Sequence, residues 1–202
     1  MNTFEESYVQ DSETGFSPDD PLQRDREDRR AVREFLAGRR DALGDLFRRY
    51  RKDVYAIAHR FTGNKDDALD VTQEVFLKLI ERMDEFERSA RFSTWLYRVA
   101  VNQSIDCMRR RRRRAAAPLG DAVVEVTGGG TDPVERAERR EVSASLMHAL
   151  DQLSDKHRSV IVLHGLENLS YKEIARVMGC SEGTVMSRLY YARKYLAEIL
   201  GR

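Results

Sequence analysis

Cysteine and histidine are scarce in this 202-residue chain, and the shortage excludes several kinds of site. The two cysteines, Cys107 and Cys180, lie far apart and form no CxxC pair, and the four histidines are scattered. Disulfide scaffolds and zinc sites need closely spaced sets of such residues. We therefore expect two reduced thiols, no metal site and no cofactor.

Long hydrophobic runs are also absent. No apolar stretch approaches the roughly 18 residues that a membrane-spanning helix needs. The N-terminus is acidic and polar, unlike a secretory signal. These features predict a cytoplasmic protein with no membrane insertion.

The recurrent sequence motifs of catalysis are missing. The chain has no GxxxxGK[ST] phosphate loop, no HExxH and no nucleophile elbow, and its many carboxylates show no fixed spacing. We therefore expect a protein that is not an enzyme.

Charge is abundant and unevenly distributed. Charged residues make up 34% of the chain, yet the formal net charge is only +1. Residues 1–30 carry nine acidic and four basic side chains, and residues 115–142 carry six and three. Residues 31–114 have thirteen acidic and twenty basic side chains, and residues 143–202 have six and eight. Two basic blocks separated by an acidic connector are typical of two modules that face a polyanion.

The hydrophobic pattern is helical almost throughout, which predicts an all-α fold. Apolar residues recur every three or four positions between Leu43 and Phe61, over Lys65–Asp84, and from a helix cap at Ser93 into an arginine block. Glycine and proline interrupt the pattern between residues 115 and 133. We expect an acidic disordered tail over residues 1–28, a helical domain over 29–114, a flexible linker over 115–133, and a second small helical domain over 134–202.

Residues 169–189 predict a helix-turn-helix. Ser170 and Glu173 form a capping box at the start of a short helix, and Gly179 provides a left-handed end. Ser181 then caps a second helix with apolar residues at Val185, Leu189 and Ala192. The second helix of such a motif enters the DNA major groove. The alternative is an ordinary helical hairpin within a bundle.

Six consecutive arginines, Arg109–Arg114, end the third helix of the first domain. We expect phosphate contact, because so many guanidinium groups repel one another without an anion nearby. The alternative is a solvated basic helix end, which the helix dipole also favours.

The helix over Lys65–Asp84 has an unusually wide apolar side. Phe76 and Leu77 fall beside the Val71, Val75 and Leu79 stripe, and the remaining surface is acidic. Such a face suits a protein partner with basic residues. An ordinary amphipathic helix with a solvated acidic face fits the pattern alone at least as well.

The segment Arg88–Trp95 combines arginines, hydroxyls and aromatic rings. These side chains can hold single-stranded DNA by stacking and phosphate contact. For Trp95 we favour a place in the core, because Leu96 and Val99 continue its face.

Together these motifs resemble the sigma-70 family, in particular its extracytoplasmic-function (ECF) branch. Asp67–Leu79 is similar to the D-x-x-Q-E-x-F signature of sigma domain 2, and Phe92–Asn102 to the F-x-T-W-L run that follows it. Asp151–Ser154, Leu169–Ala175 and Gly183–Leu189 resemble sigma domain 4. No domain 3 pattern lies between them.

The resemblance implies a transcription initiation factor that works with core RNA polymerase. Domain 2 is implied to bind the clamp helices of the β′ subunit through Asp70, Gln73, Glu74 and Leu77, which reverses our preference for a merely solvated acidic face. Domain 4 is implied to contact the −35 element and the β flap, and such factors often have an anti-sigma partner. The residues implied to engage the melted −10 element are Arg88, Arg91, Asn102, Asp106, Arg109 and Arg110.

The recognition helix departs from the family pattern at Met186, where relatives usually carry arginine or lysine. Methionine can touch a thymine methyl group but cannot form a bidentate pair with guanine. We expect Thr184, Ser187, Arg188 and Tyr191 to face outward, Met186 and Tyr190 to lie at the flanks, and Arg188 to be the main polar contact to the −35 element.

Two other functions compete with this one. A stand-alone helix-turn-helix repressor or activator predicts a dimer and a palindromic site, but it leaves the first domain unexplained. A nuclease would need a cluster of metal-binding carboxylates, which the sequence does not show.

Overall fold

A computed structural model describes residues 21–86, 91–115, 145–167 and 169–201 of the chain. Within these ranges the protein is entirely helical, apart from turns, and contains no strand. The predicted all-α fold is confirmed. The N-terminal domain contains α2 (Pro21–Leu36), α3 (Ala42–Thr62), α4 (Lys65–Glu81), the 3₁₀ turn η1 (Met83–Glu85) and α5 (Phe92–Ala115). The C-terminal domain contains helical residues 145–152 followed by α7 (Asp155–Glu167), α8 (Tyr171–Met178) and α9 (Glu182–Ile199).

A sharp turn at Gly63 and Asn64 joins α3 to α4. Gly63 adopts φ +67°, and its N–H donates to the carbonyl oxygen of His59. The Asn64 side chain then accepts hydrogen bonds from the N–H groups of Asp66 and Asp67, which begins α4. A left-handed glycine and an asparagine cap are the residues that these two positions require.

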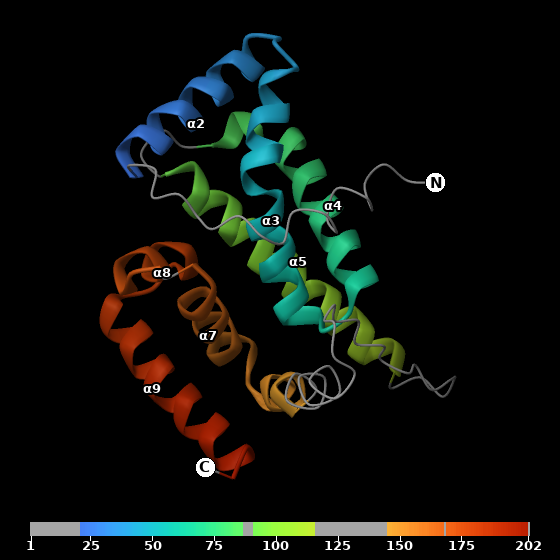
Figure 1. Cartoon of the computed structure of the whole chain (residues 1–202), viewed down its shortest axis with the longest axis vertical. Helices are drawn as coiled ribbons and strands as arrows, with labels where there is room; N and C mark the ends of the chain where they lie inside the picture. The colour runs from blue at the N-terminus through green and yellow to red at the C-terminus, as the bar shows by residue number, and fades with distance from the viewer. Residues whose placement is uncertain (1–20, 87–90, 116–144, 168, 202) are drawn as a thin grey trace, which may run out of the picture.

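Helices α3, α4 and α5 pack side by side around a hydrophobic core (Figure 1). Tyr50 on α3 lies among aromatic neighbours, with ring centroids 5.5 Å from Phe92 and 6.2 Å from Tyr97. Leu46, Ile57, Val75, Leu79 and Leu96 are fully buried in the same cluster. The apolar residues that recur every three or four positions in the sequence are thus the residues that form this core.

The prediction that residues 21–28 belong to a disordered tail is wrong, because α2 begins at Pro21. Asp28 is only 2% exposed and accepts hydrogen bonds from the Tyr50 hydroxyl and the Arg49 guanidinium. Arg24 lies over the Tyr50 ring, 5.0 Å from its centroid. The charged residues that suggested disorder therefore have partners on α3. Residues 1–20 lie outside the described residues.

Helix α5 begins one residue before the predicted cap at Ser93. The Trp95 N–H donates to the Arg91 carbonyl oxygen, so the helical pattern includes Phe92, whose ring is fully buried. Trp95 is half-buried against Phe86 and Phe92, as favoured for this residue. Burial of Phe92 in this ring cluster sets the start of the helix.

The C-terminal domain contains the predicted helix-turn-helix. The Ser170 and Glu173 capping box is present at the start of α8, and Gly179 ends that helix with φ +61°. The Ser181 side chain accepts from the Thr184 N–H at the start of α9. Val185, Leu189 and Ala192 are buried, as predicted.

The two domains pack directly against each other, α7 on α3 and α8 on α5 (Figure 1). Their buried residues form one continuous hydrophobic cluster. Met147 reaches the α3–α4 turn, where a Cβ on Gly63 would lie only 2.8 Å from the Met147 Cε. The predicted linker, residues 115–133, lies outside the described residues except for Ala115 at the end of α5, as does the start of the second domain up to residue 144.

None of the helices within the described ranges is both long enough and apolar enough to span a lipid bilayer.

Candidate nucleic-acid interface

Helix α4 exposes a mixed acidic and apolar face. Leu77 is 59% exposed and Ile80 is 43% exposed, beside exposed Asp70 and Gln73. Phe76 differs from the expectation, because it is buried and its ring packs 4.7 Å from that of Phe47. The wide apolar side of α4 therefore consists of a buried part against α3 and an exposed part around Leu77.

Glu74 on the same helix is half-buried and paired within the chain. The Arg110 guanidinium lies 3.2 Å from its carboxylate. This hydrogen bond raises the pKa of Arg110. Two residues predicted for different partners, Glu74 for polymerase and Arg110 for DNA, are thus neighbours in space.

The predicted −10 residues lie along α5. Asn102, Asp106 and Arg109 are exposed, and Arg91 is half-buried at the start of the helix. Arg88 lies outside the described residues. Arg91, Asn102 and Arg109 are separated by multiples of about 3.6 residues, so they share one side of α5.

Four of the six consecutive arginines have partners inside the protein. Arg109 and Arg112 approach the Asp155 carboxylate at 2.8 and 3.8 Å. Arg110 pairs with Glu74, and Arg111 donates to the Thr62 carbonyl oxygen at 3.0 Å. Arg113 and Arg114 are exposed. More of this block is neutralised within the protein than the sequence suggests.

The outward face of the recognition helix α9 differs from the expected one. Met186 and Tyr190, expected at the flanks, are 55% and 65% exposed. Arg188 is half-buried and donates to the Cys180 Sγ atom at 3.6 Å. Thr184 is also half-buried, at the Ser181 cap, whereas Ser187 and Tyr191 are exposed as predicted. Val185 and Leu189 are buried as expected, so the difference lies in how far neighbouring residues cover Thr184 and Arg188.

A shallow recess of about 400 Å³ lies beside the exposed side of α9. Apolar and basic side chains share its wall, which combines contact area for bases with charge for phosphates. The lining residues are Tyr171, Met186, Leu189, Tyr190, Arg193 and Lys194.

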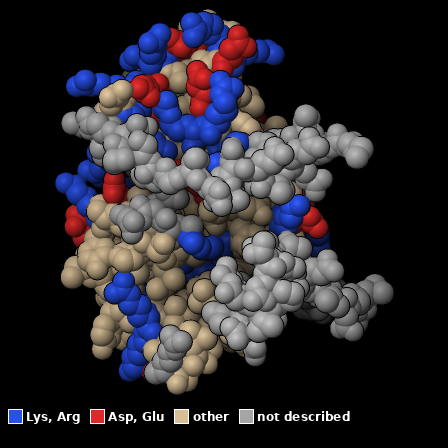
Figure 2. Space-filling view, in the orientation of Figure 1, with Lys and Arg blue, Asp and Glu red and all other residues tan. Residues whose placement is uncertain are grey.

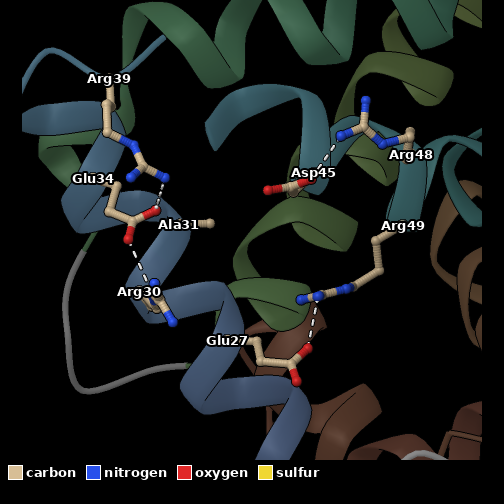
Figure 3. Close-up of a pocket in the computed structure, with 8 residues that line it drawn as sticks. All are labelled: Glu27, Arg30, Ala31, Glu34, Arg39, Asp45, Arg48 and Arg49. Carbon is tan, nitrogen blue, oxygen red and sulfur yellow. Dashed lines mark hydrogen bonds and ion pairs between the residues drawn. The ribbon is translucent and has the colours of Figure 1, made fainter. Parts of the chain in front are cut away.

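Charged side chains are mixed over the α2–α3 end of the molecule, whereas the face over α7–α9 is largely uncharged (Figure 2). At the α2–α3 end a larger recess, about 600 Å³, contains four arginines. Arg30 and Arg39 pair with Glu34, Arg48 with Asp45, and Arg49 with Glu27 (Figure 3). Because each guanidinium has a carboxylate partner, this recess has little attraction left for an anionic ligand.

The sequence did not reveal the arginines that join the two domains. Arg98 on α5 donates to the Arg176 and Val177 carbonyl oxygens at the end of α8. Arg158 on α7 is 1% exposed and donates to the Arg60 and Phe61 carbonyl oxygens at the end of α3. The only sequence signal was for Arg98, which shares the helical side of Arg91 and Arg109.

Burial lowers the pKa of the Arg158 guanidinium below its usual value, and its pairing with Asp151 opposes that change. The group remains a cation, since its pKa starts so far above neutrality. A permanent buried charge here requires fixed partners, and the α3 carbonyl oxygens provide them.

Cys107 and Cys180 are free, half-buried thiols. Burial raises the pKa of Cys107, which keeps it a protonated thiol at neutral pH. Within the described ranges, no three histidine, cysteine, aspartate or glutamate side chains gather where they could hold a metal ion.

Comparison with known proteins agrees with this arrangement. The family described as Sigma-70 region 2 matches residues 46–114, and Sigma-70, region 4 matches residues 143–196. The ECF RNA polymerase sigma factor SigW of Bacillus subtilis is 30% identical over 179 residues, covering 85% of this chain and 96% of SigW. The ECF RNA polymerase sigma-E factor of Escherichia coli K12 is 32% identical, covering 81% of this chain and 88% of that protein.

Two solved structures share the fold. CnrH, in complex with the cytosolic domain of CnrY, has a TM-score of 0.66 and 27% identity, covering 87% of this chain and 97% of CnrH. The sigma factor RpoE of Bartonella quintana, in complex with the anti-sigma factor NepR, has a TM-score of 0.60 and 25% identity, covering 80% and 98%.

These relatives span both domains in one chain, which supports an RNA polymerase sigma factor over a stand-alone repressor or activator. The helix-turn-helix alone left that choice open, and the N-terminal domain decides it. The chain belongs to the ECF sigma factors of the sigma-70 family.

Proposed function

We propose that three separate surfaces of this sigma factor divide the work of promoter recognition. The exposed part of α4 binds core RNA polymerase, the Arg91–Arg109 side of α5 holds the melted −10 element, and the exposed side of α9 contacts the −35 element. The observation that carries this proposal is the outward placement of Met186 and Tyr190 on the second helix of a helix-turn-helix. Large side chains that do not pack internally are available to a ligand.

The polymerase surface is proposed to be Asp70, Gln73, Glu74 and Leu77, facing the clamp helices of β′. Its support is the exposure of Leu77 beside acidic and amide groups, which can pair with basic residues of a protein partner. In the C-terminal domain, the β flap is proposed as a second polymerase contact. Both contacts are to a bacterial polymerase, so we place the protein in the cytoplasm, acting without catalysis of its own.

The −35 reading is proposed to depend on Met186, Tyr190 and Tyr191, with Ser187 beside them. These side chains can make contact with thymine methyl groups. Arg193 and Lys194, in the adjacent recess, can contact phosphates. Arg188 has a smaller role than the sequence predicted, because its guanidinium is turned toward Cys180.

A protein inhibitor is proposed as a further partner. The RpoE structure of similar fold is a complex with an anti-sigma factor. Affinity purification of the full chain from its own cells, followed by identification of a partner that blocks its binding to core polymerase, tests this part.

The polymerase surface is tested by the double variant Gln73→Ala/Leu77→Ala. Both side chains are exposed, so we expect a folded protein that co-purifies with core polymerase at a small fraction of the wild-type amount. The matched control is Leu36→Ala, a leucine 50% exposed at the end of α2. Wild-type co-purification of the double variant, or equal loss in the control, refutes the assignment.

Promoter recognition is tested with holoenzyme reconstituted from the purified full chain. Sequencing of the transcripts made from genomic DNA gives the promoter elements. A shared sequence at both the −10 and the −35 positions is expected. Enrichment at neither position refutes the division of roles.

A further inference from the structure

Two neighbouring arginines at the end of α5 point to different elements. The Arg109 guanidinium lies 2.8 Å from the Asp155 carboxylate of α7. The Arg110 guanidinium lies 3.2 Å from the Glu74 carboxylate of α4. Successive side chains of an α-helix are about 100° apart around its axis. Arg110 therefore lies off the Arg91–Arg109 side of α5 that is proposed to hold the −10 element.

The Arg110 guanidinium restrains the Glu74 carboxylate without using up its hydrogen-bonding capacity. One Arg110 nitrogen lies 3.2 and 3.3 Å from the two Glu74 oxygens. Cys107, one turn earlier on α5, is a second hydrogen-bond partner of the same guanidinium. An ionised carboxylate can accept about four hydrogen bonds, and the Glu74 side chain is 40% exposed. Glu74 is thus oriented from α5 and still available to a basic group of a partner.

The end of α5 also reduces repulsion among acidic residues of α4. Asp67, Asp70 and Glu74 follow one another at three- and four-residue spacing, so they lie on one side of that helix. Like charges at this spacing destabilise a helix. Arg110 pairs with Glu74, and Arg111 lies 3.6 Å from Asp67, while Asp70 between them is exposed. Two positive charges from α5 therefore border the acidic side of α4.

We propose that Arg110 is a positioning residue of the polymerase surface and not a contact to DNA. It holds the Glu74 carboxylate in the orientation in which a basic side chain of core polymerase binds it. Without this restraint the Glu74 side chain must be ordered when the partner binds, which costs affinity. The inference rests on the proposed role of Glu74 in binding polymerase.

Three roles for Arg110 lead to different results in a double-mutant cycle. A direct contact between Arg110 and polymerase would contribute independently of Glu74, so the losses from the two substitutions would add. A contact between Arg110 and DNA would leave binding to core polymerase unchanged. Only a positioning role makes the effect of Arg110 on polymerase binding depend on the presence of Glu74. The interaction free energy of the cycle measures that dependence.

The first measurement is equilibrium binding of the labelled full chain to core polymerase. We expect Glu74→Gln to weaken binding about tenfold and Arg110→Gln about fivefold, and the double variant to bind no more weakly than Glu74→Gln alone. Arg110→Lys keeps a positive charge within reach of Glu74 and should recover most of the affinity. The matched control is Arg48→Gln, which removes an arginine–aspartate ion pair within α3 and should match the wild type. Circular dichroism confirms that each variant is folded.

The second measurement compares the adjacent arginines in DNA binding. Holoenzyme is assembled with enough core polymerase to bind all of each variant. The probe is a labelled single-stranded DNA that carries the −10 sequence identified by transcript sequencing. We expect Arg109→Gln to weaken binding of this strand, because Arg109 lies on the side of α5 proposed for the −10 element. Arg110→Gln should bind the strand as tightly as the wild type.

Three results would overturn the positioning role while the proposed function stands. They are additive losses in the cycle, an unchanged core affinity in Arg110→Gln, and a loss of strand binding in Arg110→Gln as large as that in Arg109→Gln. A different result marks failure of the proposed function itself. If Glu74→Gln binds core polymerase as tightly as the wild type, the polymerase role of Glu74 is wrong, and the role of Arg110 is overturned with it.

Discussion

The Arg158 guanidinium of α7 donates a hydrogen bond of 2.6 Å to the carbonyl oxygen of Phe61 at the end of α3 and lies over the Phe61 ring, 5.6 Å from its centroid. The two residues are 97 positions apart and belong to different domains. A buried cation is therefore held by the main chain of one domain and by the Asp151 carboxylate of its own. This pair is the point at which the sigma factor's two DNA-binding modules become one packed unit.

Arg158→Met should lower the free energy of unfolding by about 2–6 kcal/mol. The substitution keeps much of the side-chain volume but leaves the Arg60 and Phe61 carbonyl oxygens without donors, and each buried unpaired group costs about 1–3 kcal/mol. Urea unfolding followed by circular dichroism measures the change. Arg48→Met, at an arginine whose side chain is 70% exposed, is the control and should change stability little. A loss below about 0.5 kcal/mol for Arg158→Met would mean that the buried contact contributes nothing net.

Gly63→Ala and Gly179→Ala should separate backbone strain from domain contact. Both glycines have positive φ, +67° and +61°, so alanine costs about 1–2 kcal/mol at either. Only at Gly63 would the new Cβ meet another group, the Met147 Cε at 2.8 Å, whereas Gly179 has open space. We expect the Met147→Ala substitution to offset part of the Gly63→Ala cost, by about 0.5–1 kcal/mol in a double-mutant cycle. The same cycle with Gly179→Ala should be additive, and additivity at both sites would contradict the contact.

Met186→Arg should change the −35 sequence that the holoenzyme selects. Met186 is 55% exposed on α9, and arginine there can form a bidentate pair with guanine. We expect guanine to be enriched at one position of a randomised −35 library. Tyr190→Ala should weaken selection at a neighbouring base, while Arg188→Ala should leave the selected sequence nearly unchanged, since that guanidinium faces Cys180. A strong effect of Arg188→Ala with none of Met186→Arg would place the reading face on the other side of the helix.

His59 should make the protein less stable as the pH falls from 7 toward 6. Burial lowers the pKa of His59 below its usual 6.5, so the unfolded chain takes up a proton in this range more readily than the folded protein. Stability therefore falls as the pH decreases through the unfolded value. His59→Gln should flatten this part of the stability profile, measured by urea unfolding at several pH values. His148, which is exposed, is replaced in the same way as the control. An unchanged slope in His59→Gln would show that His59 is equally easy to protonate in both states.

Asp28 and Gly63 show why some parts of this structure could be predicted from the sequence and others could not. The helix caps form hydrogen bonds to groups only a few positions away in the chain. The sequence therefore predicts the observed turn at Gly63–Asn64, the capping box at Ser170 and the helix end at Gly179. Asp28 and Arg24 read as part of an acidic tail, because their partner Tyr50 is over twenty residues away. The start of α2 was therefore missed.

The sequence by itself determined the helices after α2, the helix-turn-helix and the likeness to sigma domains 2 and 4, because periodicity, caps and motif spacing are local properties of the chain. The tertiary structure alone decided that Arg188 is half-buried against Cys180 while Met186 stays exposed, since this depends on contacts between α9 and the preceding turn. It alone also placed Asp155 and Glu173 on the arginines of α5. Those contacts join residues from different domains, and no pattern within either domain specifies which surface of the other it will meet.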